Sequence, residues 1–188
     1  MRFLPLVLVF LFLAIGVGWR SWWQHRRYGT WGMALFRGHG RWLEAAAVLA
    51  PLLLVADAAA AVWRPALFAP LPLPRLVALV GAAIVLAALA LMVVAQLDLG
   101  ASWRVGIDPG ARPGLVTDGA YRYSRNPIFA CMLLALAGFA LVLPDVCMLT
   151  LAAGGCVVVW RQVGAEERYL AATYGDAYEA YKRRVRRF

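Results

Sequence analysis

The sequence predicts an all-α, polytopic integral membrane protein with about five transmembrane helices and a helical cap on the cytoplasmic side. Two observations predict this fold class. Of the 188 residues, 63% are hydrophobic and the mean hydropathy is +0.70, well above the roughly 45–50% apolar content of soluble domains. The apolar residues also gather in long runs, and a membrane-crossing helix needs about 20 such residues. We therefore treat residues 1–188 as a single membrane domain.

Five apolar runs come close to the length of a membrane span. They cover Phe3 to Trp19, Leu43 to Trp63, Leu76 to Leu97, Ile128 to Leu143 and Val146 to Val163. The first run follows Arg2 as in a signal sequence, but bulky basic residues stand where a cleavage site needs small ones, so we expect a retained helix. The last two runs are short, which indicates that they extend into their polar flanks or tilt.

The connections between the spans differ in composition. The segment Arg64 to Arg75 contains four prolines and predicts a stiff, extended spacer. Pro144 and Asp145 predict a tight turn between the last two spans. The segment Asp98 to Pro127 is rich in Gly, Pro, Asp and Arg, and long loops of this kind are often binding loops. The tail predicts a helix, a break at Gly175 and a second, amphipathic helix, which forms the cap.

The charge distribution predicts the orientation in the membrane. The net charge is +9, and sixteen of the 19 Lys and Arg residues fall within Arg20 to Arg41, within Arg104 to Arg125, or from Arg161 onward. With five spans these three segments share one side, and Lys and Arg are enriched in cytoplasmic loops. We therefore expect the N-terminus outside and the C-terminus in the cytoplasm. Topology and anionic lipid headgroups explain the basic residues, and we expect no nucleic-acid partner.

Residue types that commonly bind metals do not form a metal motif. Cys131, Cys147 and Cys156 lie in apolar spans without metal or redox spacing, and we expect them to be small packing residues. His25 and His39 lie in the first cytoplasmic segment without a third ligand nearby. We therefore expect no bound metal.

Two polar segments flank the last apolar hairpin, Ile128 to Val163. The first is Gly119 to Pro127, and the second runs from Glu166 to Val185. An antiparallel hairpin brings its two ends to the same membrane face, so we expect the two segments to meet and form a site. Asn126 suits a helix N-cap and Pro127 the first helical position. A capped helix entry and a ligand-binding turn both explain the first segment.

The second segment places polar side chains on one face of the continued fifth helix. Gln162 and Glu166 lie one turn apart, with Tyr169 three residues further, whereas Arg161 lies on a different face. The neighbouring carboxylates of Glu166 and Glu167 repel each other, so at least one needs a cationic partner. A cationic ligand held also by aromatic faces is one candidate. The candidates within the chain are Arg168, Lys182 and Arg183.

Four consecutive features of the sequence together resemble the isoprenylcysteine carboxyl methyltransferase family. They are the segment Leu115 to Phe129, the apolar hairpin, the pair Glu166-Glu167 and the segment Tyr174 to Val185. They are similar, more loosely, to the phospholipid N-methyltransferases. The resemblance covers about Ser102 to Val185. It implies an N-terminal three-helix part, residues 1–97, a methyltransferase-like catalytic part, residues 98–188, and S-adenosylmethionine bound at the cytoplasmic face. We expect a bacterial inner (plasma) membrane as the location.

The resemblance also assigns roles by position. Glu166 lies at the reaction centre and is the catalytic candidate. Gln162 stands where eukaryotic members have an arginine that helps to hold the substrate carboxylate, and Asn126 stands where they have histidine. The substrate-binding candidates are Trp103, Arg161 and Gln162. The expected cofactor contacts are Leu115, Val116, Tyr121, Asn126, Pro127, Phe129, Glu167 and Tyr178.

The sequence thus predicts an integral membrane S-adenosylmethionine-dependent methyltransferase that acts on a lipid-like or membrane-partitioned substrate, among membrane lipids. A carboxylate acceptor needs no base, whereas an amine or hydroxyl must lose a proton, so the accepting atom stays open. NADPH-dependent sterol or enone reductases, which share a similar C-terminal architecture, are one alternative, although Glu166 and Glu167 would repel a polyphosphate. A non-catalytic membrane scaffold, which needs only helix caps and snorkelling arginines, is the other.

Overall fold

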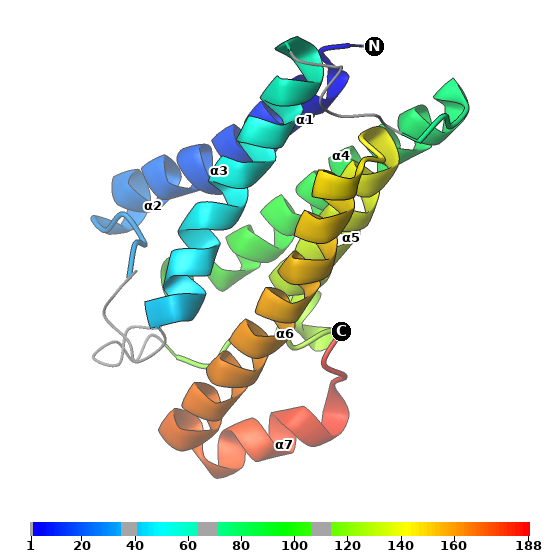
Figure 1. Ribbon diagram of the computed structural model, residues 1–188. Coiled ribbons are helices and arrows are strands. Elements are labelled where there is room, and N and C mark those ends of the chain that lie inside the picture. The colour runs from blue at the N-terminus through cyan, green and yellow to red at the C-terminus, as the bar shows by residue number, and fades with distance from the viewer. Residues whose placement is uncertain (1, 35–40, 64–70, 107–113) are drawn as a thin grey trace.

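The computed structural model describes residues 2–34, 41–63, 71–106 and 114–188. These ranges are helical almost throughout and contain no strand, only two isolated bridges. The long helices form one bundle, with the N-terminus at one end and the C-terminal helix at the other (Figure 1). The predicted all-α class is confirmed. Most of the predicted proline-rich spacer, residues 64–70, lies outside the described residues.

Four helical stretches in these ranges are long and apolar enough to cross a membrane. They are Leu4–Tyr28, Trp42–Trp63, Arg75–Ser102 and Val146–Tyr174. A fifth apolar helix, Pro127–Val142, has 16 residues and falls just short of the about 17 to 25 that a span needs. The chain is therefore a polytopic membrane protein in which all five predicted runs are helices and four have the full length of a span.

The first helical stretch is longer than predicted. Helix α1 (Leu4–Leu13) continues through a π-helical turn, η1 (Ala14–Trp19), into α2 (Arg20–Tyr28). The basic residues that follow Trp19 are thus helical, and the predicted loop begins later. The stop comes at Gly29, whose φ of 72° lies in the left-handed region and whose N–H bonds back to the carbonyl of His25, as in many helix C-caps.

The remaining helices follow the predicted order. They are α3 (Arg41–Trp63), α4 (Arg75–Leu99), α5 (Pro127–Val142), α6 (Val146–Tyr174) and α7 (Asp176–Arg184). Asp145 caps α6 by accepting a hydrogen bond from the N–H of Met148 at 2.8 Å, which fixes the predicted turn. Helix α6 extends well past Val163, and Gly175, with φ of 51°, separates it from α7 as predicted.

Helices α4 and α5 pack with their backbones almost in contact. A Cβ added at Gly138 would lie 2.8 Å from the carbonyl oxygen of Gly81, and one added at Gly81 would lie 2.7 Å from that of Gly138. Only glycine permits this approach, and small residues at helix contacts are typical of membrane bundles. The two glycines therefore fix the distance between the helix that precedes the long connection and the helix that follows it.

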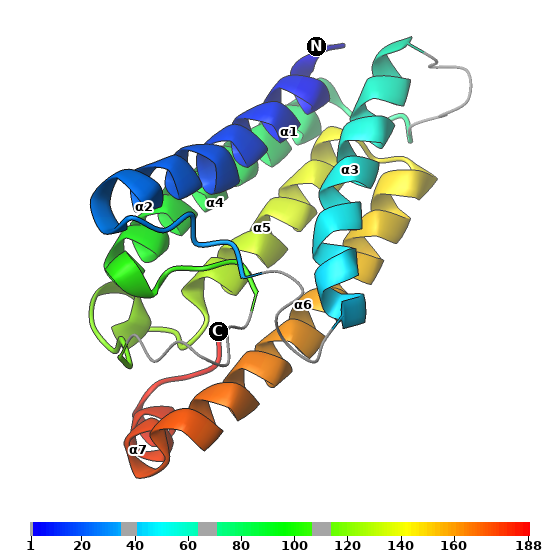
Figure 2. The same cartoon turned by 90° about the vertical axis from the view of Figure 1, so that its left-hand side faces the viewer.

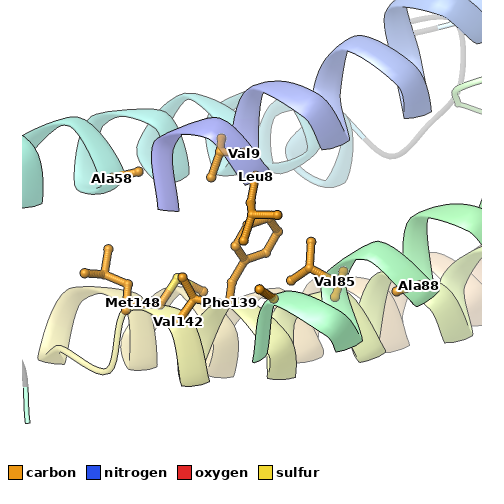
Figure 3. Close-up of a cluster of buried hydrophobic side chains, with 11 residues drawn as sticks. Leu8, Val9, Ala58, Val85, Ala88, Phe139, Val142 and Met148 are labelled. Atoms are coloured by element: carbon orange, nitrogen blue, oxygen red, sulfur yellow. The ribbon is translucent and has the colours of Figure 1, made fainter. Parts of the chain in front are cut away.

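The buried apolar core lies in the half of the bundle that contains the N-terminus. Phe139 of α5 lies among Leu8 and Val9 of α1, Val85 of α4 and Met148 of α6 (Figure 3). Because lipid is as apolar as these side chains, close packing rather than escape from water holds such a core together. Toward the other half of the bundle the same helices surround a cavity.

Candidate functional site

The two polar segments at the ends of the α5–α6 hairpin meet, as predicted. The connection that enters α5 and the end of the chain lie beside each other near α7 (Figure 2). The N–H of Arg125 donates to the carbonyl of Arg186 at 2.9 Å, and Ser124 and Arg186 form a parallel bridge. The Ser124 hydroxyl donates to the carbonyl of Arg187 at 3.1 Å. Residues far apart in the sequence are thus joined at one end of the bundle.

Glu167 lies at the centre of this junction, with 7% of its surface exposed. Its Oε1 accepts hydrogen bonds from Arg125 Nη2 at 2.9 Å and from Asn126 Nδ2 at 3.3 Å. Its Oε2 accepts one from Arg187 Nη2 at 2.5 Å. Arg125 Nη1 also donates to the Val185 carbonyl at 2.6 Å. The cationic partners of Glu167 therefore differ from the three basic residues predicted from the sequence, because the end of the chain folds back onto α6.

Asn126 occupies the predicted N-cap position of α5, but its side chain does not cap the helix. Instead, Nδ2 donates to Glu167 and to the carbonyl of Arg187 at 3.2 Å. Pro127 takes the first helical position, as predicted. The helix entry is therefore real, and the amide of Asn126 joins it to the Glu167 junction.

Three tyrosines lie beside the junction. Tyr181 Oη donates to the carbonyl of Tyr121 at 2.6 Å, and the rings of Tyr178 and Tyr181 meet edge to face at 6.2 Å. Burial raises the pKa of Tyr178 and of Tyr181 to about 12. Burial, followed by the charge of Glu166, also raises the pKa of Tyr121 well above its usual range. All three phenols therefore keep their protons at neutral pH.

A cavity of about 420 Å³ begins at this end of the bundle. Its volume lies within the roughly 300–1,000 Å³ of small-molecule sites. The lining follows α6 from Tyr174, its last residue, to Met148 in its first turn, a distance of about 39 Å at 1.5 Å per residue. Residues of α1, α3, α4 and α5 and of the connection between α4 and α5 form most of the other walls. The cavity thus connects the polar end of the bundle to its apolar core.

The two ends of the cavity differ in chemistry. Near the junction it is lined by Arg104, Tyr121, Asn126, Gln162, Glu166, Tyr169, Tyr174 and Tyr181. Toward the core it is lined by Phe12, Leu54, Leu136, Phe139, Met148 and Leu151. The arrangement suits a polar reacting group at one end and an apolar chain at the other.

Most of the site residues predicted from the sequence line this cavity. They are Trp103, Leu115, Val116, Tyr121, Asn126, Phe129, Gln162 and Glu166. Gln162, Glu166 and Tyr169 share the cavity face of α6, as their spacing predicted, and Arg161 is exposed on another face. Three further predicted contacts are buried outside the lining: Pro127, Glu167 and Tyr178.

The Glu166 side chain is half-buried and lines the cavity. Within the described ranges it forms no hydrogen bond or ion pair, in contrast to the neighbouring Glu167. The guanidinium of Arg104, which also lines the cavity, interacts with it electrostatically. A carboxylate without a fixed partner in a mainly apolar cavity is a suitable contact for a cationic ligand.

The sequence did not predict that the N-terminal helix holds the segment after α4. Arg20 of α2 is fully buried, and its Nη2 donates to the carbonyls of Gln96 at 3.1 Å and Gly100 at 2.9 Å. Its guanidinium lies 4.6 Å from the ring centroid of Trp103, and Nη1 donates to Gln24 Oε1 at 2.7 Å. Gln96, a polar residue within the apolar run Leu76 to Leu97, was the available signal, because such groups usually face a bundle interior.

In the described part of the chain, no group of three or more His, Cys, Asp or Glu residues is arranged to hold a metal ion. The imidazole of His25 stacks on the ring of Trp31 with centroids 4.3 Å apart. His39 lies outside the described residues.

Sequence comparison identifies the family. The sequence profile described as phospholipid methyltransferase matches residues 76–177, more than half of the chain. The chain belongs to the phospholipid methyltransferase family. In this phospholipid methyltransferase family member, the matched region begins in the first turn of α4. The resemblance described from the sequence begins later, near Ser102. The matched region includes Glu166 and ends in the first turn of α7.

A curated relative agrees with this assignment. A protein-S-isoprenylcysteine O-methyltransferase of Schizosaccharomyces pombe is 32% identical over 75 residues, which make up 38% of this chain and 30% of that protein. The matched part thus spans less than a third of the relative's length. The predicted resemblance to the isoprenylcysteine and phospholipid methyltransferases is confirmed. Helices α1 and α3 lie outside the region matched by the phospholipid methyltransferase profile, although both line the cavity.

Proposed function

We propose that this chain is a membrane methyltransferase that transfers a methyl group from S-adenosylmethionine to a lipid-like or membrane-partitioned acceptor at the cytoplasmic face. The observation that carries the proposal is the cavity, which joins Glu166 at its polar end to an apolar interior at the other. Membership of the phospholipid methyltransferase family supports the reaction class. The cavity supports a ligand that is polar at one end and apolar along its length.

The residues at the polar end fit S-adenosylmethionine. This molecule carries a sulfonium and an amino group, both positive, and Glu166 offers a carboxylate that has no ion pair among the described residues. Tyr121 and Phe129 add aromatic faces, which attract cations. Leu115 and Val116 provide apolar walls beside them. In this proposal Pro127, Glu167 and Tyr178 support the wall of the site from behind.

Bound S-adenosylmethionine supplies an electrophilic methyl group, and the electron pair of its carbon–sulfur bond stays on sulfur when the acceptor's lone pair forms the new bond to carbon. The apolar walls of the cavity exclude water from the acceptor. If the acceptor is an amine or a hydroxyl, the Glu166 carboxylate accepts its proton. If the acceptor is a carboxylate, no proton is released, and the same group serves to attract the donor.

The acceptor class follows from the shape and lining of the cavity. An acyl or isoprenoid chain of an amphiphile fills the part of the cavity near Phe139 and Met148, and its headgroup lies near Gln162 and Glu166. The name of the fission-yeast relative, an isoprenylcysteine O-methyltransferase, is consistent with such an acceptor. Gln162 distinguishes this chain from members with an arginine at that position, and it favours no particular accepting atom.

The orientation in the membrane and the separate roles of residues 1–97 and 98–188 are part of the same proposal. In this proposal the polar end of the bundle lies in the cytoplasm, where S-adenosylmethionine is made, and the N-terminus lies outside a bacterial inner membrane; the three basic segments support this orientation. Residues 98–188 then supply the reacting groups. Residues 1–97 supply mainly apolar wall, including Phe12 and Leu54, together with the polar side chains of Glu44 and Gln96.

Calorimetric titration of the detergent-purified chain with S-adenosylhomocysteine and with NADPH tests the proposal. We expect the first ligand to bind and the second not to bind. Glu166→Gln should weaken S-adenosylhomocysteine binding about tenfold, the size of one charge-assisted hydrogen bond. Glu179→Gln, an exposed carboxylate outside the cavity, is the matched control.

Each other outcome has a defined meaning. Binding of NADPH alone would indicate a reductase, and binding of neither ligand would leave the non-catalytic scaffold. Unchanged S-adenosylhomocysteine affinity in both Glu166→Gln and Glu166→Ala would remove Glu166 from the site while the reaction class stands.

A further inference from the structure

The cavity has one arginine in its lining that forms no fixed ion pair with a described residue, although Glu166 interacts with it electrostatically. Two arginines line it, Arg104 and Arg125. Arg125 is committed to the Glu167 carboxylate and to the Val185 carbonyl. The Arg104 guanidinium forms no hydrogen bond or ion pair with a described residue. Arg104 is half-buried, and a cation in the wall of a mainly apolar cavity favours a ligand with an anionic group.

Arg104 is held in place by its two neighbours in the chain. The ring of Trp103 is fixed beneath the guanidinium of Arg20 and is packed so closely on Gly32 that a Cβ there would lie 2.5 Å from it. Val105 donates its N–H to the carbonyl of Gly32 at 2.7 Å. The backbone of Arg104 is thus fixed on both sides by the N-terminal part of the chain, and its side chain is preorganised toward the cavity.

The electrostatics separate two ligand positions. Arg104 interacts with Glu166, so the two opposite charges lie near each other at the polar end. The methyl donor carries a net positive charge, which Glu166 attracts and Arg104 repels. An anionic group next to Arg104 therefore belongs more favourably to the second ligand. The wall supplied by the N-terminal helix, including Phe12, Leu13 and Val17, is apolar, so that second ligand is an amphiphile.

We propose that Arg104 binds the anionic headgroup, a carboxylate or a phosphate, of the amphiphilic methyl acceptor. This inference rests on the proposed methyltransferase function and makes it more specific. Arg104 is a substrate-specificity residue in this proposal, and Arg20 is a positioning residue that acts through Trp103.

Binding of matched probe pairs to the detergent-purified full chain tests the proposal. One pair is N-acetyl-S-farnesylcysteine and its carboxamide, and the other is oleoyl lysophosphatidate and oleoylglycerol. The two members of a pair share the apolar chain and differ in headgroup charge. The quantity compared between variants is the ratio of their affinities, in which differences in partition into detergent micelles cancel. The variants are Arg104→Gln, Arg104→Lys and the control Arg122→Gln, which removes the same charge from an exposed position outside the cavity.

We expect the wild-type chain to prefer the anionic member of at least one pair by about tenfold, the size of one charge-assisted hydrogen bond. Arg104→Gln should abolish that preference, Arg104→Lys should retain part of it, and Arg122→Gln should keep it. The pair that shows the preference identifies carboxylate or phosphate. S-adenosylhomocysteine affinity should be unchanged in Arg104→Gln, which also shows that this variant is folded.

Two results would overturn the proposal. The first is a preference that persists in Arg104→Gln or is absent from the wild-type chain. The second is a loss of S-adenosylhomocysteine affinity in Arg104→Gln as large as the loss for the anionic probe, because Arg104 would then bind the carboxylate of the donor. If the wild-type chain binds no S-adenosylhomocysteine, the proposed function fails. The probe pairs still decide whether Arg104 binds an anionic headgroup.

Discussion

Replacing Glu167 by glutamine distinguishes a carboxylate that holds the fold together from one that holds a ligand. In their ion pair, the side chains of Glu167 and Arg125 are 8% and 9% exposed, and removing one partner of such a buried pair costs about 3–5 kcal/mol. The pair with Arg187 is 38% exposed on the arginine side and adds little. Glutamine keeps one oxygen acceptor, so we expect the lower value, about 3 kcal/mol.

The expected change is measurable by thermal unfolding in a mild detergent. For a chain of this length, each kcal/mol lowers the melting temperature by about 2–4 °C, so Glu167→Gln should melt about 6–12 °C below the wild-type chain. Glu179→Gln is the control, since Glu179 and Lys182 form a pair in which both side chains are 45% exposed, and it should change stability by less than about 0.5 kcal/mol. A Glu167→Gln variant that melts with the wild-type chain but no longer binds S-adenosylhomocysteine would refute the structural role.

Two further predictions concern the packing and the buried phenols. Gly138→Ala should destabilise the protein by about 1–3 kcal/mol because its methyl group overlaps the backbone of α4. The control Gly154→Ala, whose methyl group meets open space, should leave stability unchanged. Equal melting temperatures of the two variants would contradict the close α4–α5 contact. The free energy of unfolding should fall as pH rises from about 10 to about 12, since folded Tyr178 and Tyr181 hold their protons to a pKa of about 12 and unfolded tyrosines lose theirs near 10. A Tyr178→Phe, Tyr181→Phe double variant should lose less stability over that range in denaturant titrations, and an identical decline would count against the assigned burial.

The architecture was predictable because a membrane imposes a length and a polarity on each span. The errors lie at helix ends. The charged residues after Trp19 indicated a loop, but nothing in that segment stops a helix, and α2 continues to the first strong stop signal, Gly29. Helix α6, in contrast, continues beyond Val163 as predicted, because Ala and Glu are good helix formers outside the membrane as well. A change of polarity marks the edge of the hydrocarbon and does not mark the end of a helix.

The site was predictable to the extent that its residues share one helix face or one hairpin. The spacing of Gln162, Glu166 and Tyr169 placed all three side chains on one face, and they line the cavity together. The partners of Glu167 were not predictable, because Arg187 reaches it only when the end of the chain folds back. Arg20 was missed for a related reason, since two of its acceptors are the backbone carbonyls of Gln96 and Gly100, which leave no mark in the sequence.

The π-helical turn η1 has a consequence for the register of the first helix. Compared with a regular helix, such a turn accommodates an extra residue, and here the carbonyl of Gly16 within it accepts a hydrogen bond from Gln96 at 2.8 Å. If Ala14 to Trp19 formed a regular α-helix instead, every following side chain would be rotated by about 100° around the helix axis. Arg20 would then face away from the end of α4 and from Trp103. The first helix lies outside the region that the family profile matches. Its rotation about its own axis nevertheless determines whether Arg20 can hold the segment around Trp103, which lines the candidate site.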